Sequence, residues 1–196
     1  MTAPLGVILA GGRSSRMGRD KALVEIGGMT MIDRVAAALS DAGLDAVVAG
    51  PPRPGVDLPT VTDTAGIGPL AGLLTGLRTR PGADVFLTAV DQPLLRPGTV
   101  RALLATPGVA VAPFAGVAQV TCAVYRPELA SAARTAAAGA GSLRSLLDDV
   151  DATLVSETVW RTWGEDGRSW LSVDQPDDVA LVEELLSGSG LRSDHE

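Results

Sequence analysis

The chain alternates between short runs of apolar residues and longer stretches in which apolar positions recur every three or four residues. Short apolar runs bounded by glycine and proline are typical of buried β-strands, and the longer spacing is typical of helices that cover a sheet. This alternation through the first half predicts right-handed crossovers and a mainly parallel sheet. The expected strands of this half are 5–9, 44–49, 60–63 and 84–90, and the expected helices begin near Thr30, Pro69 and Pro97.

Local signals mark several helix boundaries. Thr30 is a suitable N-cap because Asp33 follows three residues later, a variant of the capping box. Pro69 fits the first turn of a helix that ends near residue 78. Gly72 and Gly76 weaken this helix intrinsically, which indicates that its backbone packs closely against the sheet or against a ligand.

The second half is less regular. Its expected strands are 109–113, 117–125, 152–155 and 170–173, and its expected helices are 127–138, 142–149 and 177–186. The stretch 158–169 gives no clear prediction. We expect one domain over residues 1–186, followed by a disordered tail at 187–196 that is rich in glycine and serine.

Composition and charge narrow the functional class. The chain has 196 residues, 46% of them hydrophobic, and a formal net charge of −7, which argues against nucleic acid or an anionic membrane as the main partner. No secretory signal or membrane-length apolar run is found, and we expect a cytoplasmic protein. The single cysteine, Cys122, lies in an expected buried strand and suits a structural thiol. The single histidine, His195, lies in the expected tail, so we expect no histidine-based catalysis.

The first strand leads into a loop, 9–21, that contains three glycines, three arginines and one lysine. Glycine lets the backbone approach a ligand, and successive backbone N–H groups form a concavity that binds anions. The basic side chains add direct contacts to phosphate oxygens. The loop is not a P-loop, because Gly18 is followed by Arg19. The simplest fitting ligand is a nucleoside triphosphate; the structural alternative is a surface loop whose charges are solvated.

Two aspartates follow expected strands. Asp91 comes after the run 84–90, and α/β sheets bind ligands at the carboxyl ends of such strands. Asp174 comes after 170–173, in the second of two Asp-Gln-Pro tripeptides. Mg²⁺ is bound by one or two carboxylates together with phosphate oxygens and water, so both are candidate metal ligands. The structural alternatives are a turn cap for Asp91 and the N-cap of the last helix for Asp174.

The loop resembles a signature of the nucleotidyltransferases that join nucleotides to sugar phosphates and to molybdopterin. Its sequence, Leu-Ala-Gly-Gly-x-Ser-x-Arg-Met-Gly-x-Asp-Lys, is similar to the molybdenum cofactor guanylyltransferase branch, and Gly-Pro-Leu-Ala-Gly at 68–72 is a second match. The related cytidylyltransferase branch tends to have Ala-Ala-Gly at the loop. The resemblance implies an α/β fold of the nucleotide-diphospho-sugar transferase type: a single-domain, Rossmann-like three-layer sandwich with a mainly parallel mixed sheet.

The resemblance also assigns roles to residues. Lys21 and Asp91 are implied to bind nucleotide phosphate, Asp91 through Mg²⁺, and Asp174 is the second candidate ligand. Arg13 and Arg16 are, with Lys21, the candidates to neutralise charge that develops on the phosphates. The implied nucleotide-binding positions are Leu9, Ala10, Gly11, Gly12, Lys21, Asp63, Gly68, Pro69, Leu70 and Asp91.

The implied reaction is Mg²⁺-dependent transfer of GMP from GTP to the phosphate of molybdenum-bound molybdopterin. An attacking phosphate is already ionised near neutral pH, so the reaction needs no general base. Transient contact with molybdopterin-loading proteins or molybdoenzymes is a further expectation. Two alternatives stay open: a related enzyme that uses CTP or another phosphorylated acceptor, and a non-catalytic nucleotide-binding adaptor in cofactor delivery.

The chain departs from the family pattern at two places. The family often has an asparagine after the second strand, where this chain has Ala49-Gly50, and this bears on guanine selection. The late family motif is usually Asn-x-Asn-Thr-Pro, where this chain has Ser172-Val173-Asp174-Gln175-Pro176. The second change replaces amide donors with a hydroxyl and a carboxylate, so it bears on the metal and on the molybdopterin side of the site.

Overall fold

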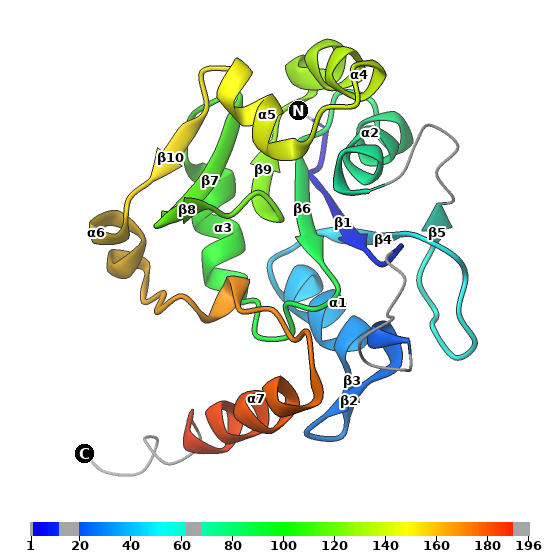
Figure 1. The fold of residues 1–196 in the computed structure, drawn as a ribbon, viewed down its shortest axis with the longest axis vertical. Helices are drawn as coiled ribbons and strands as arrows, with labels where there is room; N and C mark the ends of the chain where they lie inside the picture. Colours follow the sequence, from blue (N-terminus) through cyan, green and yellow to red (C-terminus); the bar gives the residue numbers. More distant parts are fainter. Residues whose placement is uncertain (1, 12–19, 62–67, 190–196) are drawn as a thin grey trace.

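A mixed sheet forms the middle layer of the computed structural model, which describes residues 2–11, 20–61 and 68–189 (Figure 1). In spatial order its described strands are β10 (Thr153–Val155), β7 (Ala110–Ala115), β9 (Cys122–Tyr125), β6 (Val85–Ala89), β1 (Leu5–Leu9), β4 (Asp45–Ala49) and β5 (Thr60–Val61), and β8 (Val117–Ala118) pairs with β7 beside this path. β6, β1, β4 and β5 are parallel, whereas β9 is antiparallel to both β6 and β7. The mainly parallel mixed sheet that we predicted is confirmed.

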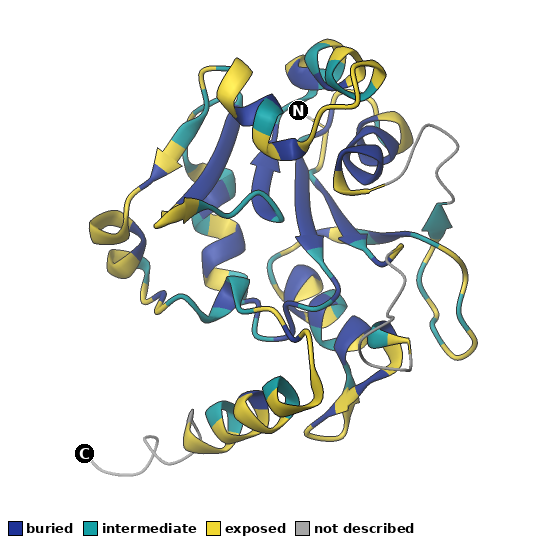
Figure 2. Cartoon of the chain, in the orientation of Figure 1, coloured by how far each residue is buried: buried dark blue, intermediate teal, exposed yellow. Residues whose placement is uncertain are grey.

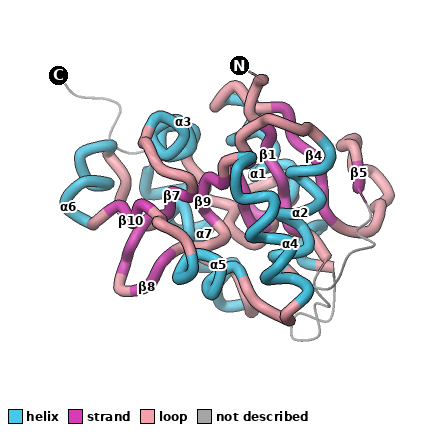
Figure 3. The backbone as a smooth tube through the Cα atoms, turned by 90° about the horizontal axis from the view of Figure 1, so that it is seen from above, coloured by secondary structure: helices cyan, strands magenta, loops and turns pink. Residues whose placement is uncertain are grey.

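Helices cover both faces of the sheet, which gives three layers (Figure 3). One face carries α2 (Pro69–Thr79), α4 (Ala130–Ala138) and α5 (Leu143–Asp149), and the other carries α1 (Met31–Asp41), α3 (Pro97–Ala105) and α6 (Glu157–Trp160). Successive residues of β1 serve opposite faces: Val7 packs with α2, and Ile8 packs with α1. The central strands are therefore buried on both faces, as Figure 2 shows.

The local signals at the helix starts act as the sequence predicts. Before the first helix, Gly27 and Gly28 have φ of 54° and 76° and form the turn between β2 (Glu25–Ile26) and β3 (Met29–Thr30). The Thr30 side chain accepts a hydrogen bond from the backbone N–H of Asp33 at 3.2 Å, which confirms the N-cap of α1. The open question about the glycines of α2 is also decided: a Cβ on Gly72 would lie 2.2 Å from Cδ2 of Leu9. α2 therefore approaches β1 more closely than a larger residue would allow.

Two strand predictions in the second half are wrong. The stretch 117–125 is divided into β8 and β9 by a turn in which Cys122 N–H donates to the carbonyl of Gln119 at 2.9 Å. The stretch 170–173 is not a strand, because residues Arg168–Trp170 form a 3₁₀ turn. That turn is held by tertiary contacts: the Trp170 ring packs edge-on against Trp160, with ring centroids 5.2 Å apart.

The last described element is α7 (Pro176–Ser189), which extends three residues into the stretch expected as a tail (Figure 1). Residues 190–196, including His195, lie outside the described residues. Cys122 is buried in β9, as expected for a structural thiol. Burial raises the pKa of its thiol, and the nearby Glu165 carboxylate adds to the rise. None of the described helices is long and apolar enough to cross a membrane.

Candidate functional site

The carboxyl ends of the parallel strands lie at one edge of the sheet, and the candidate residues that the structure describes gather there. The backbone N–H of Ala10, just past β1, donates to the carbonyl of Ala49 at 3.0 Å. The backbone N–H of Val90, just past β6, donates to the carbonyl of Leu9 at 3.0 Å. Asp91 follows directly, so the parallel register brings it beside the start of the glycine-rich loop.

Lys21 is the centre of the site. It begins a short 3₁₀ turn, η1 (Lys21–Leu23), that is capped by Asp20, whose Oδ1 accepts a hydrogen bond from Ala22 N–H at 3.0 Å. The Lys21 ammonium Nζ lies 3.2 Å from Oδ2 of Asp91 and 2.6 Å from Oδ1 of Asp174. The structure therefore brings together three residues that were chosen from separate parts of the sequence.

The environment of Lys21 stabilises its charged form. Burial lowers the pKa of the ammonium, but the carboxylates of Asp174 and Asp91 outweigh burial and raise that pKa above its ordinary value. Lys21 is also the only lysine in the sequence, although the chain has 16 lysines and arginines in all. An ammonium is a compact point charge, which suits contact with oxygen atoms that arrive from several directions.

Asp91 is fixed by the residues around it. Its backbone carbonyl accepts a hydrogen bond from Val173 N–H at 2.8 Å, so the segment before α7 is tied to the end of β6. The next residue, Gln92, is 2% exposed; its Oε1 accepts from Ala89 N–H at 3.1 Å, and its Nε2 donates to the Thr121 hydroxyl at 3.3 Å. The sequence interpretation missed this role of Gln92, for which the repeated Asp-Gln-Pro tripeptide was the available signal.

The first turn of α7 shows where the Asp174 carboxylate is directed. The Oδ2 atom of Asp178 accepts hydrogen bonds from the backbone N–H groups of Asp174 and Gln175, at 2.7 and 2.9 Å. α7 begins at Pro176, so its N-cap position is Gln175 and not Asp174, and Asp178 accepts the N–H groups ahead of the helix as the N3 residue of a capping box does. The Asp174 side chain pairs with Lys21 instead, and it is half-exposed.

The start of α2 also belongs to this edge. Gly68 has φ of 96°, which favours glycine, and Pro69 begins the helix as expected. Gly68 and Pro69 are exposed, whereas Leu70 is buried. Since Gly72 contacts Leu9, the first turn of α2 lies beside the carboxyl end of β1. Four other predicted site residues, Gly12, Arg13, Arg16 and Asp63, lie outside the described residues.

The donor set suits a hard divalent cation that is shared with a substrate. Among the residues that the structure describes, no group of three or more His, Cys, Asp or Glu side chains could hold a metal by itself. Asp91 and Asp174 nevertheless present two carboxylates toward the same ammonium. One or two carboxylates together with phosphate oxygens form a typical Mg²⁺ shell, so these residues fit that ion.

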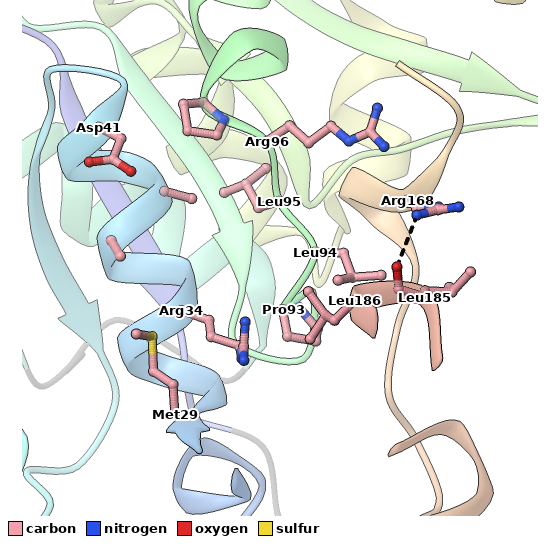
Figure 4. Close-up of a pocket in the computed structure, with 13 residues that line it drawn as sticks. Met29, Arg34, Asp41, Pro93, Leu94, Leu95, Arg96, Arg168, Leu185 and Leu186 are labelled. Carbon is pink, nitrogen blue, oxygen red and sulfur yellow. Dashed lines mark hydrogen bonds between the residues drawn. The ribbon is translucent and has the colours of Figure 1, made fainter. Parts of the chain in front are cut away.

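A pocket of about 360 Å³ lies elsewhere, between α1, α7 and the segment that follows Gln92 (Figure 4). Its three arginines are bound to the protein itself: Arg34 donates to the carbonyl of Ile26, Arg96 to that of Gly164, and Arg168 to that of Leu185. Its described lining does not include Lys21 or either aspartate. The candidate site at the sheet edge is therefore separate from this pocket.

Comparison with known proteins gives concordant matches. The model of the MobA-like NTP transferase domain matches residues 6–156. A probable molybdenum cofactor guanylyltransferase of Chloroflexus aggregans is 30% identical over 200 residues, which cover 95% of this chain and 96% of the relative. A protein of the same name from Mycobacterium avium is 36% identical over 161 residues, which cover 75% and 82% of the two chains.

Two solved structures share the fold. Molybdopterin-guanine dinucleotide biosynthesis protein A from Archaeoglobus fulgidus matches with a TM-score of 0.81 and 20% identity, over 93% of this chain and 98% of that one. The 2-C-methyl-D-erythritol 4-phosphate cytidylyltransferase of Thermus thermophilus matches with a TM-score of 0.71 and 20% identity, over 94% and 99%. At these identities the likeness concerns the fold alone, and it confirms the predicted transferase-type α/β architecture.

Proposed function

Because this chain belongs to the MobA-like NTP transferases and is a nucleotidyltransferase, we propose that it transfers GMP from GTP to the phosphate of molybdopterin. The names of its sequence relatives support a guanylyl group as the transferred unit. The observation that carries the proposal is the Lys21 ammonium held between the carboxylates of Asp91 and Asp174 at the sheet edge. That arrangement places a cation and two hard oxygen donors where a strand-end site receives phosphates.

The proposed reaction joins two anions. An oxygen of the molybdopterin phosphate attacks the α-phosphorus of GTP, a new P–O bond forms, and the bond to the β-phosphate breaks and releases pyrophosphate. The attacking phosphate is already ionised, so the protein has to position the groups and offset their charge. Lys21 serves this purpose by contacting the triphosphate, with Arg13 and Arg16 as further proposed cations.

Mg²⁺ is the proposed metal, held by Asp91 and Asp174. When bound, it would lower the negative charge of the phosphates and fix their orientation. The backbone of Leu9, Ala10 and the glycines at 11 and 12 is proposed to approach the triphosphate. Asp63 and the first turn of α2, from Gly68 to Leu70, are proposed to line the ribose and base. The molybdopterin product would pass to molybdopterin-loading proteins or molybdoenzymes in the cytoplasm.

The first experiment is calorimetric titration of the purified protein with GTP, CTP, ATP and UTP, with and without Mg²⁺. We expect selective GTP binding that Mg²⁺ strengthens. A preference for CTP would indicate the alternative, a related enzyme that uses CTP as the nucleotide donor. Binding of GTP without turnover in the presence of molybdopterin would favour the adaptor alternative, and failure to bind any nucleotide would refute the proposal.

The second experiment assigns the carboxylates. We expect Asp91→Asn to lower Mg²⁺-dependent turnover by at least about 100-fold, because the site would hold Mg²⁺ more weakly and lose the charge stabilisation that the ion supplies to the phosphates. Asp174→Asn should have a smaller effect, because its carboxylate is more exposed than that of Asp91. Asp45→Asn is the matched control, since Asp45 pairs with Arg80 at the start of β4. Unchanged turnover in Asp91→Asn would remove Asp91 from the site.

A further inference from the structure

We infer that Arg53, in the connection between β4 and β5, is a positioning residue that holds together the two ends of the glycine-rich loop and orients Lys21. This inference rests on the proposed function, because it assigns the loop to the nucleotide phosphates. The contacts involve Ala10 before the loop, Asp20 after it, and the segment that contains Arg53.

The Arg53 guanidinium is divided among three acceptors. Its side chain is 8% exposed, although it lies in a connection rich in proline and glycine. Its Nη2 donates to the backbone carbonyl of Ala10 at 2.5 Å, and its Nε donates to Oδ2 of Asp20 at 2.7 Å. Its Nη1 donates to the carbonyl of Pro51 at 3.0 Å, which fixes the guanidinium to its own segment. The three bonds use three different nitrogens of one planar guanidinium, so their separation and directions are fixed together, which the single nitrogen of an ammonium does not reproduce.

Asp20 extends this connection to the centre of the site. One oxygen, Oδ2, accepts from Arg53, and the other, Oδ1, accepts from the backbone N–H of Ala22 at 3.0 Å. The same carboxylate therefore caps the turn that begins with Lys21. A change in the direction of the Asp20 carboxylate would alter that turn, and with it the placement of the Lys21 ammonium between its two aspartates.

Close backbone packing brings Arg53 to the loop. A Cβ on Gly50 would lie 2.8 Å from the carbonyl oxygen of Ala10 and 3.2 Å from the backbone nitrogen of Gly11. The segment that leaves β4 is thus in direct contact with the peptide that begins the loop. Arg53 is three residues further along this segment, and its contacts with Ala10 and Asp20 join two residues that are ten positions apart in the chain.

The arrangement indicates a role in position more than in charge. The Asp20 carboxylate offsets the Arg53 charge, so the pair adds little attraction for an incoming phosphate. Fixing both ends of a loop reduces the conformational entropy that the loop loses when it binds a ligand. Loss of Arg53 should therefore weaken nucleotide binding without removing a group that touches the nucleotide.

Arg80 provides a matched control with the same chemistry at the opposite end of β1. Its Nη1 donates to the carbonyls of Ala3 and Pro4, at 3.4 and 3.2 Å, and its Nη2 donates to Oδ2 of Asp45 at 2.7 Å. Both arginines thus join a carboxylate to backbone carbonyls next to β1. Removal of either arginine therefore loses similar hydrogen bonds, but only Arg53 adjoins the proposed phosphate loop.

The experiment compares Arg53→Ala, Arg53→Lys, Asp20→Asn and Arg80→Ala with the wild type. The dissociation constant for Mg²⁺ and GTP is measured by calorimetry, and the unfolding midpoint in urea is measured for each variant. We expect Arg53→Ala to raise the dissociation constant by about 10- to 100-fold, the loss expected for charge-assisted hydrogen bonds. Arg80→Ala should leave it within about twofold at a similar change in stability. The double variant Arg53→Ala/Asp20→Asn should bind GTP almost as well as Arg53→Ala alone, because Arg53 and Asp20 act as one unit.

Hydrogen exchange without nucleotide separates this inference from the proposed function. Peptides that cover residues 10–22 should exchange faster in Arg53→Ala than in the wild type, and Arg80→Ala should leave them unchanged. Equal exchange in these peptides, or equal effects of Arg53→Ala and Arg80→Ala on GTP affinity, would overturn the inference. If the wild type binds no nucleotide, the proposed function fails, while the exchange result still tests the positioning role of Arg53. Arg53→Lys keeps the test valid if Arg53→Ala does not fold, since it should show the same effects to a smaller degree.

Discussion

Replacing Lys21 with Met tests whether the ammonium serves the reaction more than the fold. Methionine keeps a long flexible side chain and removes the charge. In the structure the ammonium lies 3.2 Å from Oδ2 of Asp91 and 2.6 Å from Oδ1 of Asp174. The substitution therefore breaks two ion pairs and leaves two carboxylates facing the same space.

The expected loss of stability is modest. The side chains of Lys21 and Asp91 are 17% and 23% exposed, and that of Asp174 is 56% exposed. An exposed pair contributes about 0.2–1 kcal/mol, and a partly buried charged hydrogen bond about 1.5–3 kcal/mol at most. With solvent screening of both pairs, we expect Lys21→Met to lower the free energy of unfolding by about 1–2 kcal/mol.

The expected loss of activity is larger than this. Removal of one preorganised group that stabilises transition-state charge typically lowers turnover by about 100- to 1000-fold, or about 2.7–4 kcal/mol. Stability is measured by urea denaturation and activity by pyrophosphate release from GTP with molybdopterin. Arg161→Met is the control, because Arg161 forms an exposed ion pair with Glu157 of α6 at 2.6 Å, and neither residue is among the proposed site residues.

The pH dependence adds a second test of the same pair. The pKa of Lys21 is higher in the folded protein than its ordinary value of 10.5, so the ion pairs contribute fully below that pH. Their contribution is lost as the pH rises through the folded-state pKa. The stability difference between wild type and Lys21→Met should therefore be constant between about pH 7 and 9 and shrink above about pH 10.4.

Turnover of Lys21→Met within about tenfold of the wild type would show that Lys21 does not supply the proposed charge stabilisation. A fall in turnover that only follows the fraction of unfolded protein would show the same. Because Lys21 is the only lysine in the sequence, its labelling by an amine reagent can be followed by mass spectrometry next to the chain's amino terminus. GTP with Mg²⁺ should protect Lys21 from labelling.

Three further predictions concern packing, a buried carboxylate and the thiol. Gly76→Ala should lower the free energy of unfolding by about 1–2 kcal/mol, because its Cβ would lie 2.6 Å from Cγ2 of Val7. Gly98→Ala in α3 should raise the free energy of unfolding by up to about 1 kcal/mol, since no atom of the described residues lies within 4 Å of the new Cβ. Equal effects of Gly76→Ala and Gly98→Ala in urea melts would contradict both expectations. Glu165→Gln should lower the free energy of unfolding by about 2–3 kcal/mol, because the residue is 3% exposed and its carboxylate accepts hydrogen bonds from the N–H groups of Asp166 and Gly167 at 2.9 and 2.7 Å. A loss below about 0.5 kcal/mol would contradict this role of Glu165. Cys122 should react with a thiol reagent only after unfolding, because burial first and then Glu165 raise its pKa, and fast reaction of the folded protein near neutral pH would show otherwise.

Local sequence determined the parts of the fold that depend on near neighbours. The apolar run of β1, the Thr30 cap and the proline at the start of α2 each rest on groups within about one turn of one another, and all three are confirmed. Strand-end positions and residue types at short spacing also indicated the glycine-rich loop and Asp91 as candidate site residues, and their roles stay predictions. The same reasoning failed at 170–173, where the contact of Trp170 with Trp160 and a buried Glu165 replace strand pairing.

The pairing of the charged side chains at the site depends on the tertiary structure. Lys21 and Asp174 are 153 positions apart, and Arg53 and Asp20 are 33 positions apart, so no local period relates them. The sequence left open whether Asp174 caps α7. In the fold, Asp178 accepts the N–H groups that precede the helix, and the Asp174 carboxylate pairs with Lys21. A hydrophobic pattern determines a helix or a strand through contacts within one segment. The residues of a site come from distant segments, and the register of the paired strands decides which of them meet. That register places the ends of β1, β4 and β6 at one edge, and it is the physical reason that Asp91 lies beside the start of the glycine-rich loop.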